Sequence, residues 1–302
     1  MFKSKNSMSR ALVRRETTAG YLFLLPSLFF FVTFVLYPMF LCIYTSFFDS
    51  NMGKNAVDVF VGLGNYKELF QDKLFLGALK NTVVIVVVAV PTVCAFSLWV
   101  ATAIYDMKPA LTSAFRCIFY LPVVTGSVAV TVVWKWMYNS RYGVFNYLFK
   151  SLGIIDQNIN WLGDARFALW CIILILFTTS VGQPIVLYVS ALGNVDHSLV
   201  EAAQVDGANR RQVFWKIKWS QIMPTTLYIL IITTINSFQC FALIQLLTSG
   251  GPTHSTDTIM YYIYYTAFKL YRYGYGHAMG VVLMIIIAVL SAVQFKLGQQ
   301  SD

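Results

Sequence analysis

The sequence predicts an all-α integral membrane protein with six transmembrane helices. Hydrophobic residues make up 58% of the 302 residues and charged residues only 12%, and the mean hydropathy is +0.64. A soluble domain carries about 25% charged residues. Six apolar runs each approach the roughly 20 residues that a helix needs to cross a bilayer. One long polar segment, residues 198–224, separates two of these runs and carries helix-capping signals of its own.

Composition argues against nucleic-acid binding and against a metal site. The net charge is +9, but the basic residues lie at the ends of apolar runs and form no stripe. All five cysteines fall inside apolar segments, which favours small buried side chains over a disulfide framework. The three histidines lie in separate segments without ligand spacing. We therefore expect the lipid bilayer, and no nucleic acid, among the partners.

Residues 1–20 form a polar, basic tail. The apolar run that follows is too long for a signal peptide and no small-residue cleavage site closes it, so we expect a retained membrane anchor. Residues 21–302 are predicted to form one transmembrane domain. Its spans are expected at residues 21–47, 81–105, 115–137, 167–192, 221–247 and 278–295. Prolines in or beside these runs are typical of helices packed in a bundle.

The distribution of Lys and Arg predicts a multi-pass protein with both termini in the cytoplasm. These residues are denser in the tail and in segment 198–224 than in the long loops at residues 49–80, 139–166 and 248–277. Basic residues are enriched in the cytoplasmic loops of membrane proteins. Segment 198–224 is therefore expected on the cytoplasmic side.

Segment 198–224 is predicted to fold as a helical hairpin. Ser198 followed by Glu201 indicates an N-cap with a capping box, and Gly207 indicates a helix end. Asn209 begins a second capping pattern and a second helix. A hairpin this small cannot bury its own apolar side chains, so we expect it to pack against a partner protein. The alternative is an amphipathic helix lying on the lipid surface.

These residues resemble the EAA loop of bacterial ABC importer permeases, which is the coupling helix that sits in a cleft of the ATP-hydrolysing subunit. The resemblance rests on the spacing of the residues that match the motif, which are Glu201, Ala202, Ala203, Asp206, Gly207, Ala208, Phe214 and Ile217. It implies contact with an ATPase for Glu201, Ala202, Ala203, Asp206, Gly207 and Phe214. Where the family usually continues with Leu-Pro, this chain has Trp219-Ser220, and Asp196 replaces a proline that is common before the motif.

The resemblance covers nearly the whole chain, residues 21–295, and points to carbohydrate-importer permeases similar to the larger maltose permease. The segments that carry it are LIQLLTSGGP at 243–252, RYGYG at 272–276 and GVFN at 143–146. It implies the type I ABC importer permease fold, a place in the bacterial cell membrane and a sugar, expected to be an oligosaccharide, as substrate. The implied partners are a second homologous permease, an ABC ATPase dimer and an extracytoplasmic solute-binding protein.

Uncharged polar side chains inside two predicted spans are the candidates for sugar binding, because polar groups facing lipid are costly and tend to face a cavity. They are Ser180 and Gln183 in the fourth span and Asn236, Ser237, Gln239 and Cys240 in the fifth. Asn236 and Gln239 are three residues apart and would share one helix face. Amide groups suit a sugar, which needs neutral donors and acceptors. The alternative is that these residues form hydrogen bonds between helices.

The chain is not expected to be an enzyme or to bind a cofactor. It has no GxxxxGK[ST] segment and no arrangement of nucleophile and base, so ATP and Mg²⁺ are expected in the partner ATPase. An importer for glycerol 3-phosphate or a related polar solute is an alternative, although an anionic substrate favours Arg or Lys at mid-span, where the sequence has none. A polytopic membrane enzyme or assembly factor is the alternative from another class.

Overall fold

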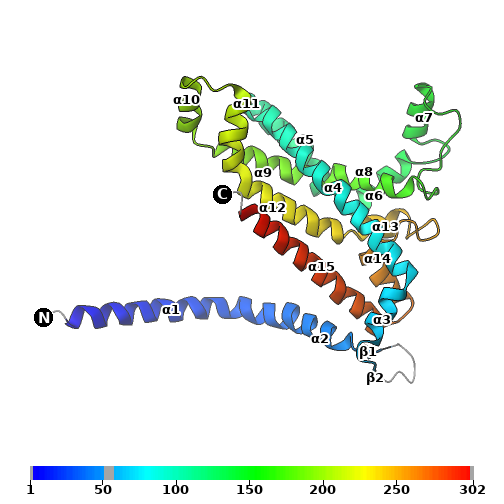
Figure 1. Cartoon of the computed structure of the whole chain (residues 1–302), viewed down its shortest axis with the longest axis horizontal. Helices are drawn as coiled ribbons and strands as arrows, with labels where there is room; N and C mark the ends of the chain where they lie inside the picture. Colours follow the sequence, from blue (N-terminus) through cyan, green and yellow to red (C-terminus); the bar gives the residue numbers. More distant parts are fainter. Residues whose placement is uncertain (1–2, 51–57, 300–302) are drawn as a thin grey trace.

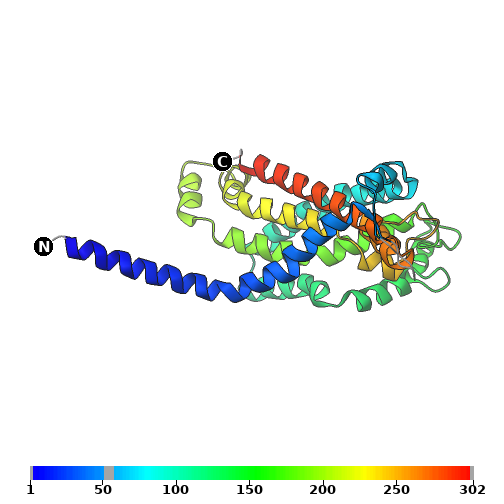
Figure 2. The same cartoon turned by 90° about the horizontal axis from the view of Figure 1, so that it is seen from below.

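The computed structural model describes residues 3–50 and 58–299, and almost all of its regular structure is helical. The first helical run consists of α1 (Lys3–Phe31), a π-helical turn η1 (Val32–Leu36) and α2 (Tyr37–Thr45). It projects away from the other helices, and α2 packs against the last helix (Figures 1 and 2). No residue of the most apolar stretch within Glu16–Thr45 is buried inside the molecule. The predicted boundary at residue 20 falls within α1, which continues through it without a break.

A short connection joins this run to the main body. Strands β1 (Phe48–Asp49) and β2 (Val59–Phe60) pair antiparallel, and α3 (Gly64–Gln71) follows them. The buried amide of Asn65 donates to the carbonyl oxygens of Ser46, at 2.8 Å, and Phe48, at 2.9 Å. These bonds fix the end of the first run against α3.

Four long helices form the core of the body: α4 (Lys73–Tyr105), α9 (Gly182–Gly193), α12 (Trp219–Phe238) and α15 (Tyr273–Gln299). The carboxylate of Asp72 caps α4 by accepting a hydrogen bond from the Leu74 amide at 2.8 Å. α4 lies against α9 and α12, and α15 packs on the other side of α12 (Figure 1). Fully buried side chains fill the contact among α4, α9 and α12, including Val93, Ile185, Tyr188, Ile222 and Ile229.

Two of the predicted spans are broken. Residues 115–137 were expected as one helix, but α5 (Pro109–Val124) and α6 (Ser127–Met137) meet at a bend of 96°. Residues 221–247 are divided between α12 and α13 (Ala242–Leu247), with three non-helical residues between them. By contrast, α8 (Ala168–Ser180) and α9 together make one apolar run of 26 residues.

Within residues 3–50 and 58–299, four helices are long and apolar enough to cross a membrane, or five if the bent pair is one span. They are Glu16–Thr45, Lys73–Tyr105, Ala168–Gly193 and Tyr273–Gly298, with Pro109–Val124 and Ser127–Met137 as the bent pair. The predicted second and sixth spans therefore begin earlier than expected, at Lys73 and Tyr273. The predicted fifth span is not among these helices because its polar residues lower its hydropathy, although α12 has 20 residues.

The remaining helices lie at the two ends of the body. They are α7 (Val144–Ser151), α10 (His197–Val205), α11 (Arg210–Val213), α14 (Ile259–Tyr264) and the π-helical turns η2 (Phe214–Lys218) and η3 (Tyr265–Lys269). α10, α11 and the last turns of α15 lie at one end, whereas α3 and α14 lie at the other, with α7 projecting beside them (Figure 1). The predicted cytoplasmic and outer segments are thus at opposite ends of the molecule.

Candidate functional site: an exposed hairpin and a polar cavity

The predicted hairpin is present as α10 and α11, but its first cap differs from the prediction. Ser198 was expected to cap α10; instead Asp196 does so, since its carboxylate accepts from the Ser198 amide at 2.9 Å and the Ser198 hydroxyl at 2.7 Å. The hydroxyl and then the amide of Ser198 lower the pKa of Asp196 below its ordinary value. Carboxylate caps are favoured at helix starts, so α10 begins one residue before Ser198.

The turn between α10 and α11 was predicted correctly. The Ala208 amide donates to the Ala203 carbonyl at 2.9 Å and the Gly207 amide to the Gln204 carbonyl at 3.0 Å, which is a Schellman motif. Gly207 has φ +86°, a conformation that disfavours residues with a Cβ atom. The cap predicted at Asn209 is also present and forms a capping box: the Gln212 amide donates to the Asn209 side chain and the Asn209 amide donates to the Gln212 side chain, each at 2.9 Å. The box expected between Ser198 and Glu201 is replaced by the Asp196 cap.

α10 presents its apolar side chains to the outside. No residue of α10 is buried, Val205 is 88% exposed and Leu199 is 50% exposed. Glu201 and Ala202 are exposed as well, whereas Ala203 is half-buried. The half-buried Val200 packs against the core of the body, and the rest of the helix projects outward (Figure 1). The sequence predicts that a partner protein binds this hairpin, and the exposed face of α10 is free for such contact.

The hairpin is joined to the body by continuous helix. From Arg210 the chain runs through α11, the π-helical turn η2 and α12 to Phe238 without a non-helical residue. The half-buried Phe214 lies at the start of η2. At the base of the hairpin the Asp196 amide donates to the Gln221 side chain at 3.1 Å. Movement of α11 would therefore be transmitted directly along α12.

The opposite half of α12 borders a cavity of about 180 Å³ whose lining combines polar and apolar side chains. Three of the six predicted substrate residues line it: Ser180, Gln183 and Asn236. Thr179 and Thr233 add hydroxyl groups, and Val123, Leu187, Ile229 and Ile232 are among its apolar walls. None of its lining residues is charged. Hydroxyl and amide groups beside apolar surface can bind a neutral polyol through hydrogen bonds and apolar contact.

The other three predicted substrate residues lie elsewhere. Asn236 and Gln239 were expected on one helix face, but α12 ends at Phe238 and Gln239 is its exposed C-cap, outside the cavity. Ser237 is buried at 2% exposure. Cys240 is buried in an apolar cluster, where its carbonyl oxygen accepts from the Thr258 hydroxyl at 2.7 Å. The break after Phe238 therefore removes Gln239 and Cys240 from the cavity, whereas Ser237 lies on a buried face of α12.

Tyr228 lines the same cavity and was missed in the sequence. It lies eight residues before Asn236 and thus on the same helix face, a spacing that was available as a signal. Val123 and Gly182 were also missed, because Val123 lines the cavity and Gly182 allows close packing only where α5 and α9 meet. A Cβ atom on Gly182 would collide with the carbonyl oxygen of Phe119.

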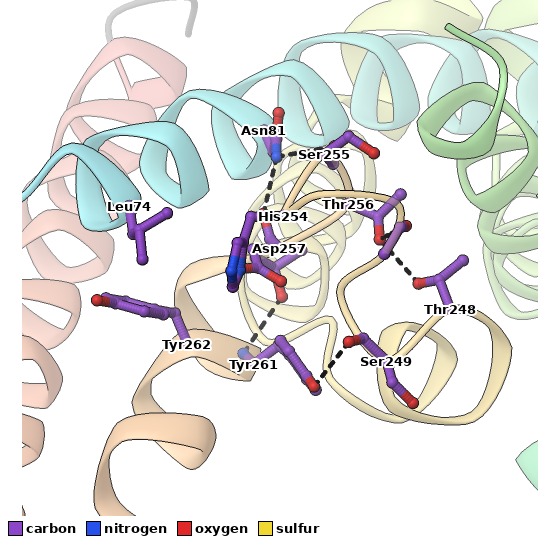
Figure 3. A network of polar contacts seen from close by, with 12 residues as sticks. Leu74, Asn81, Thr248, Ser249, His254, Ser255, Thr256, Asp257, Tyr261 and Tyr262 are labelled. Atoms are coloured by element: carbon purple, nitrogen blue, oxygen red, sulfur yellow. Dashed lines mark hydrogen bonds and ion pairs between the residues drawn. The ribbon is translucent and has the colours of Figure 1, made fainter. Parts of the chain in front are cut away.

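The loop between α13 and α14 is held rigidly at the end opposite the hairpin (Figure 3). The Asn81 side chain on α4 donates to the carbonyl oxygens of Ser255 and Asp257, at 3.1 and 3.0 Å, and the Tyr261 hydroxyl donates to the Ser249 carbonyl at 2.9 Å. His254 Nδ1 lies 2.7 Å from a carboxylate oxygen of the buried Asp257. Burial raises the pKa of Asp257, and His254 opposes this change.

A second carboxylate ties three helices together near this loop. Asp72 accepts hydrogen bonds from the hydroxyls of Tyr262 at 2.7 Å and Tyr275 at 2.9 Å, which lie on α14 and α15. Burial alone would raise the pKa of Asp72, but these hydroxyls and the backbone amides of Leu74 and Phe75 hold it below its ordinary value. The ionised carboxylate therefore stabilises this end of the bundle.

Comparison with known proteins identifies the family. The family described as the binding-protein-dependent transport system inner membrane component matches residues 71–300. The probable ABC transporter permease protein YesP of Bacillus subtilis (strain 168) is 33% identical over 288 residues, which cover 94% of this chain and 91% of YesP. The lactose transport system permease protein LacF of Rhizobium radiobacter is 32% identical over 288 residues, covering 94% of this chain and 95% of LacF.

A solved structure has the same fold. A chain in the crystal structure of a bacterial ABC transporter involved in the import of the acidic polysaccharide alginate matches with a TM-score of 0.81, over 97% of this chain and 99% of that chain. Its sequence identity is 23%, so the match shows a common fold. Since the family match covers most of the chain and two relatives exceed 30% identity, the chain belongs to the family of inner-membrane components of binding-protein-dependent transport systems.

Proposed function

We propose that this chain is a permease subunit of an ATP-driven importer that moves a neutral sugar, most simply an oligosaccharide, into the cytoplasm. The observation that carries the proposal is the continuous helix from Arg210 to Phe238, which links the exposed hairpin to the uncharged cavity beside Asn236. A partner that moves the hairpin would reshape the cavity through α12. The lactose permease among the relatives supports a sugar as the cargo.

In this proposal the hairpin docks on one subunit of an ATPase dimer, which supplies ATP and Mg²⁺. The exposed Glu201, Ala202 and Val205 would form the contact, while Gly207 and Asp206 shape the turn. A second homologous permease would complete the pathway, and an extracytoplasmic binding protein would deliver the sugar at the opposite end. The hairpin and both termini lie in the cytoplasm, and α12 with α13 and the bent pair bring the number of spans to six.

Charge favours a neutral sugar over glycerol 3-phosphate. A phosphate group removed from water needs Arg, Lys or several amide donors to replace its hydration. The residues that line the cavity include no Arg, Lys or His. A phosphate ester would therefore pay an uncompensated desolvation cost in this cavity, whereas hydroxyl groups of a sugar find Ser180, Gln183 and Asn236.

ATP hydrolysis by the reconstituted complex tests the proposal. The chain would be purified with its co-expressed partner subunits, placed in proteoliposomes with the binding protein, and supplied with neutral oligosaccharides or glycerol 3-phosphate. We expect at least one neutral oligosaccharide to stimulate hydrolysis and to accumulate in the vesicles. Stimulation by glycerol 3-phosphate alone would contradict the sugar assignment. Purification without any ATPase would instead favour a membrane enzyme or an assembly factor.

A further inference from the structure

Helix α7 is fixed to the body through one face only. Its Asn146 is 2% exposed and accepts hydrogen bonds from the Trp161 indole at 3.0 Å and the Ile159 amide at 3.1 Å. Phe145 stacks on Tyr138 with ring centroids 4.9 Å apart. These contacts hold α7 in place between the end of α6 and the start of α8, where the chain leaves and re-enters apolar helices.

An apolar slot of about 180 Å³ lies under α7. Its walls include Tyr138, Phe145, Phe149, Trp161, Trp170 and Leu174. Two polar groups of this wall are already used, since the Tyr138 hydroxyl donates to the Cys171 carbonyl and the Trp161 indole donates to Asn146. The Trp170 indole is the remaining donor in a lining that is otherwise apolar, so the slot fits a hydrocarbon chain better than a sugar.

The slot opens onto an exposed apolar surface of α8. Trp170 is 54% exposed and Leu174 is 42% exposed, and both lie on α8, within the apolar helix Ala168–Gly193. The outer face of α7 is apolar as well, because Val144 is 55%, Tyr147 is 76% and Leu148 is 46% exposed. The apolar surface therefore continues from the flank of a membrane span, through the slot, to α7.

A cationic groove of about 490 Å³ borders α7 on another side. Arg141, Lys150, Tyr147 and Asn158 contribute to its walls. Neither Arg141 nor Lys150 takes part in an ion pair within the described part of the chain. The residues that line the groove include no Asp or Glu. Two unpaired cations with amide and phenol groups are suited to a phosphate.

We propose that α7 lies in the headgroup layer of the membrane leaflet opposite the hairpin and binds phospholipid there, with phosphate in the cationic groove and acyl chain in the apolar slot. Aromatic side chains and cations beside an apolar face are typical of interfacial helices. A free organic phosphate would occupy the groove but would leave the slot and the exposed face of α7 in water. This inference depends on membrane insertion and is independent of the transported solute.

Fluorescence quenching in phosphatidylglycerol nanodiscs tests where α7 lies. A bimane label is placed at Leu148→Cys, or at the exposed loop position Gln157→Cys as the control, in a background with the native cysteines replaced. We expect brominated acyl chains to quench the label at position 148 and aqueous iodide to quench the label at 157. Iodide quenching at 148 would show that α7 faces water. Protection of 148 from both quenchers would show that a protein covers it, and either result overturns the proposal.

Native mass spectrometry of the purified complex, with its own cysteines, tests the slot and the groove separately. Leu174→Trp should block the mouth of the slot and reduce the number of retained phospholipids, whereas Ile118→Trp, at a 63% exposed site on α5, should not. The double variant Arg141→Gln with Lys150→Gln should lose the preference for phosphatidylglycerol over phosphatidylcholine. Unchanged retention in Leu174→Trp, or displacement of the lipid by inorganic phosphate alone, would contradict a phospholipid site.

Discussion

At the level of single residues, the position where α12 ends decides which amide side chains reach the cavity. A continuous helix would have placed Asn236 and Gln239 on one face, but α12 ends at Phe238. Asn236 lines the cavity and Gln239 caps the helix outside it. We predict that Asn236→Ala weakens the apparent affinity for the sugar roughly 5- to 150-fold, because a lost hydrogen bond leaves its partner unpaired at a cost of about 1–3 kcal/mol. Concentration-dependent uptake measures this effect.

Gln239→Ala is the matched control for this prediction. It removes the same kind of amide group near the same end of α12, but at a position outside the cavity. It should therefore leave the apparent affinity and the melting temperature unchanged. If Asn236→Ala instead melts earlier and transports with an unaltered concentration dependence, Asn236 serves helix packing and not sugar binding.

The carboxylate of Asp72 predicts a pH-dependent stability. Its pKa is lower in the folded protein than in the unfolded chain, so its contribution is complete above the unfolded pKa and is lost as the pH falls through the folded pKa. Asp72→Asn should therefore lower the melting temperature at pH 7, by the equivalent of roughly 1 kcal/mol after allowance for solvent screening. The difference from wild type should shrink below about pH 4. An equal difference at both pH values would contradict this account.

Several residues of the hairpin could be assigned from the sequence because they act locally. Gly207, Asn209 and Gln212 satisfy backbone groups within a few positions of themselves, so their roles follow from spacing alone. Ser198 was assigned wrongly because Asp196, two residues earlier, accepts from the Ser198 amide and starts the helix there, which places Ser198 inside α10. The role of Gly182 depends on which helices meet, which spacing along one chain does not specify.

At the level of elements, the close contact of α5 with α9 depends on Gly182. A Cβ atom there would collide with the Phe119 carbonyl on α5, so Gly182→Ala should force these helices apart beside the cavity. We predict a loss of about 1–3 kcal/mol of stability, the usual cost of overpacking. Gly193→Ala, at the other end of α9, would meet nothing closer than 3.9 Å and should have little effect. Equal melting temperatures for both variants would contradict this packing.

The helices themselves were largely predictable, whereas their breaks were not. Long apolar runs specify α4, α8 with α9, and α15, because each must satisfy its backbone internally in lipid. The 96° bend between α5 and α6 lies at Thr125 and Gly126, where three residues without an apolar side chain, Thr125-Gly126-Ser127, interrupt the apolar run, but the pattern does not specify the angle. The break after Phe238 is stabilised by a distant residue, Thr258, whose hydroxyl bonds to the Cys240 carbonyl.

At the level of the whole molecule, the hairpin and the segment that carries α7 lie at opposite ends of the long helices (Figure 1). If the hairpin is cytoplasmic, a cysteine at Val205, 88% exposed on α10, and one at the exposed Gln157 must lie on different sides of the membrane. We predict that an impermeant thiol reagent added to sealed right-side-out cells labels Gln157→Cys alone, in a background with the native cysteines replaced. Labelling of Val205→Cys alone would invert the topology.

Coupling between the hairpin and transport is the central claim, and one measurement tests it most directly. Sugar uptake and sugar-stimulated ATP hydrolysis are measured in the same proteoliposomes for wild type, Glu201→Lys and the control Ser220→Lys, which adds the same charge at an exposed position of α12. We predict that Glu201→Lys assembles in the membrane but loses both activities, because a lysine cannot replace a carboxylate in the docked surface, while Ser220→Lys retains them. Normal uptake by Glu201→Lys would contradict the account.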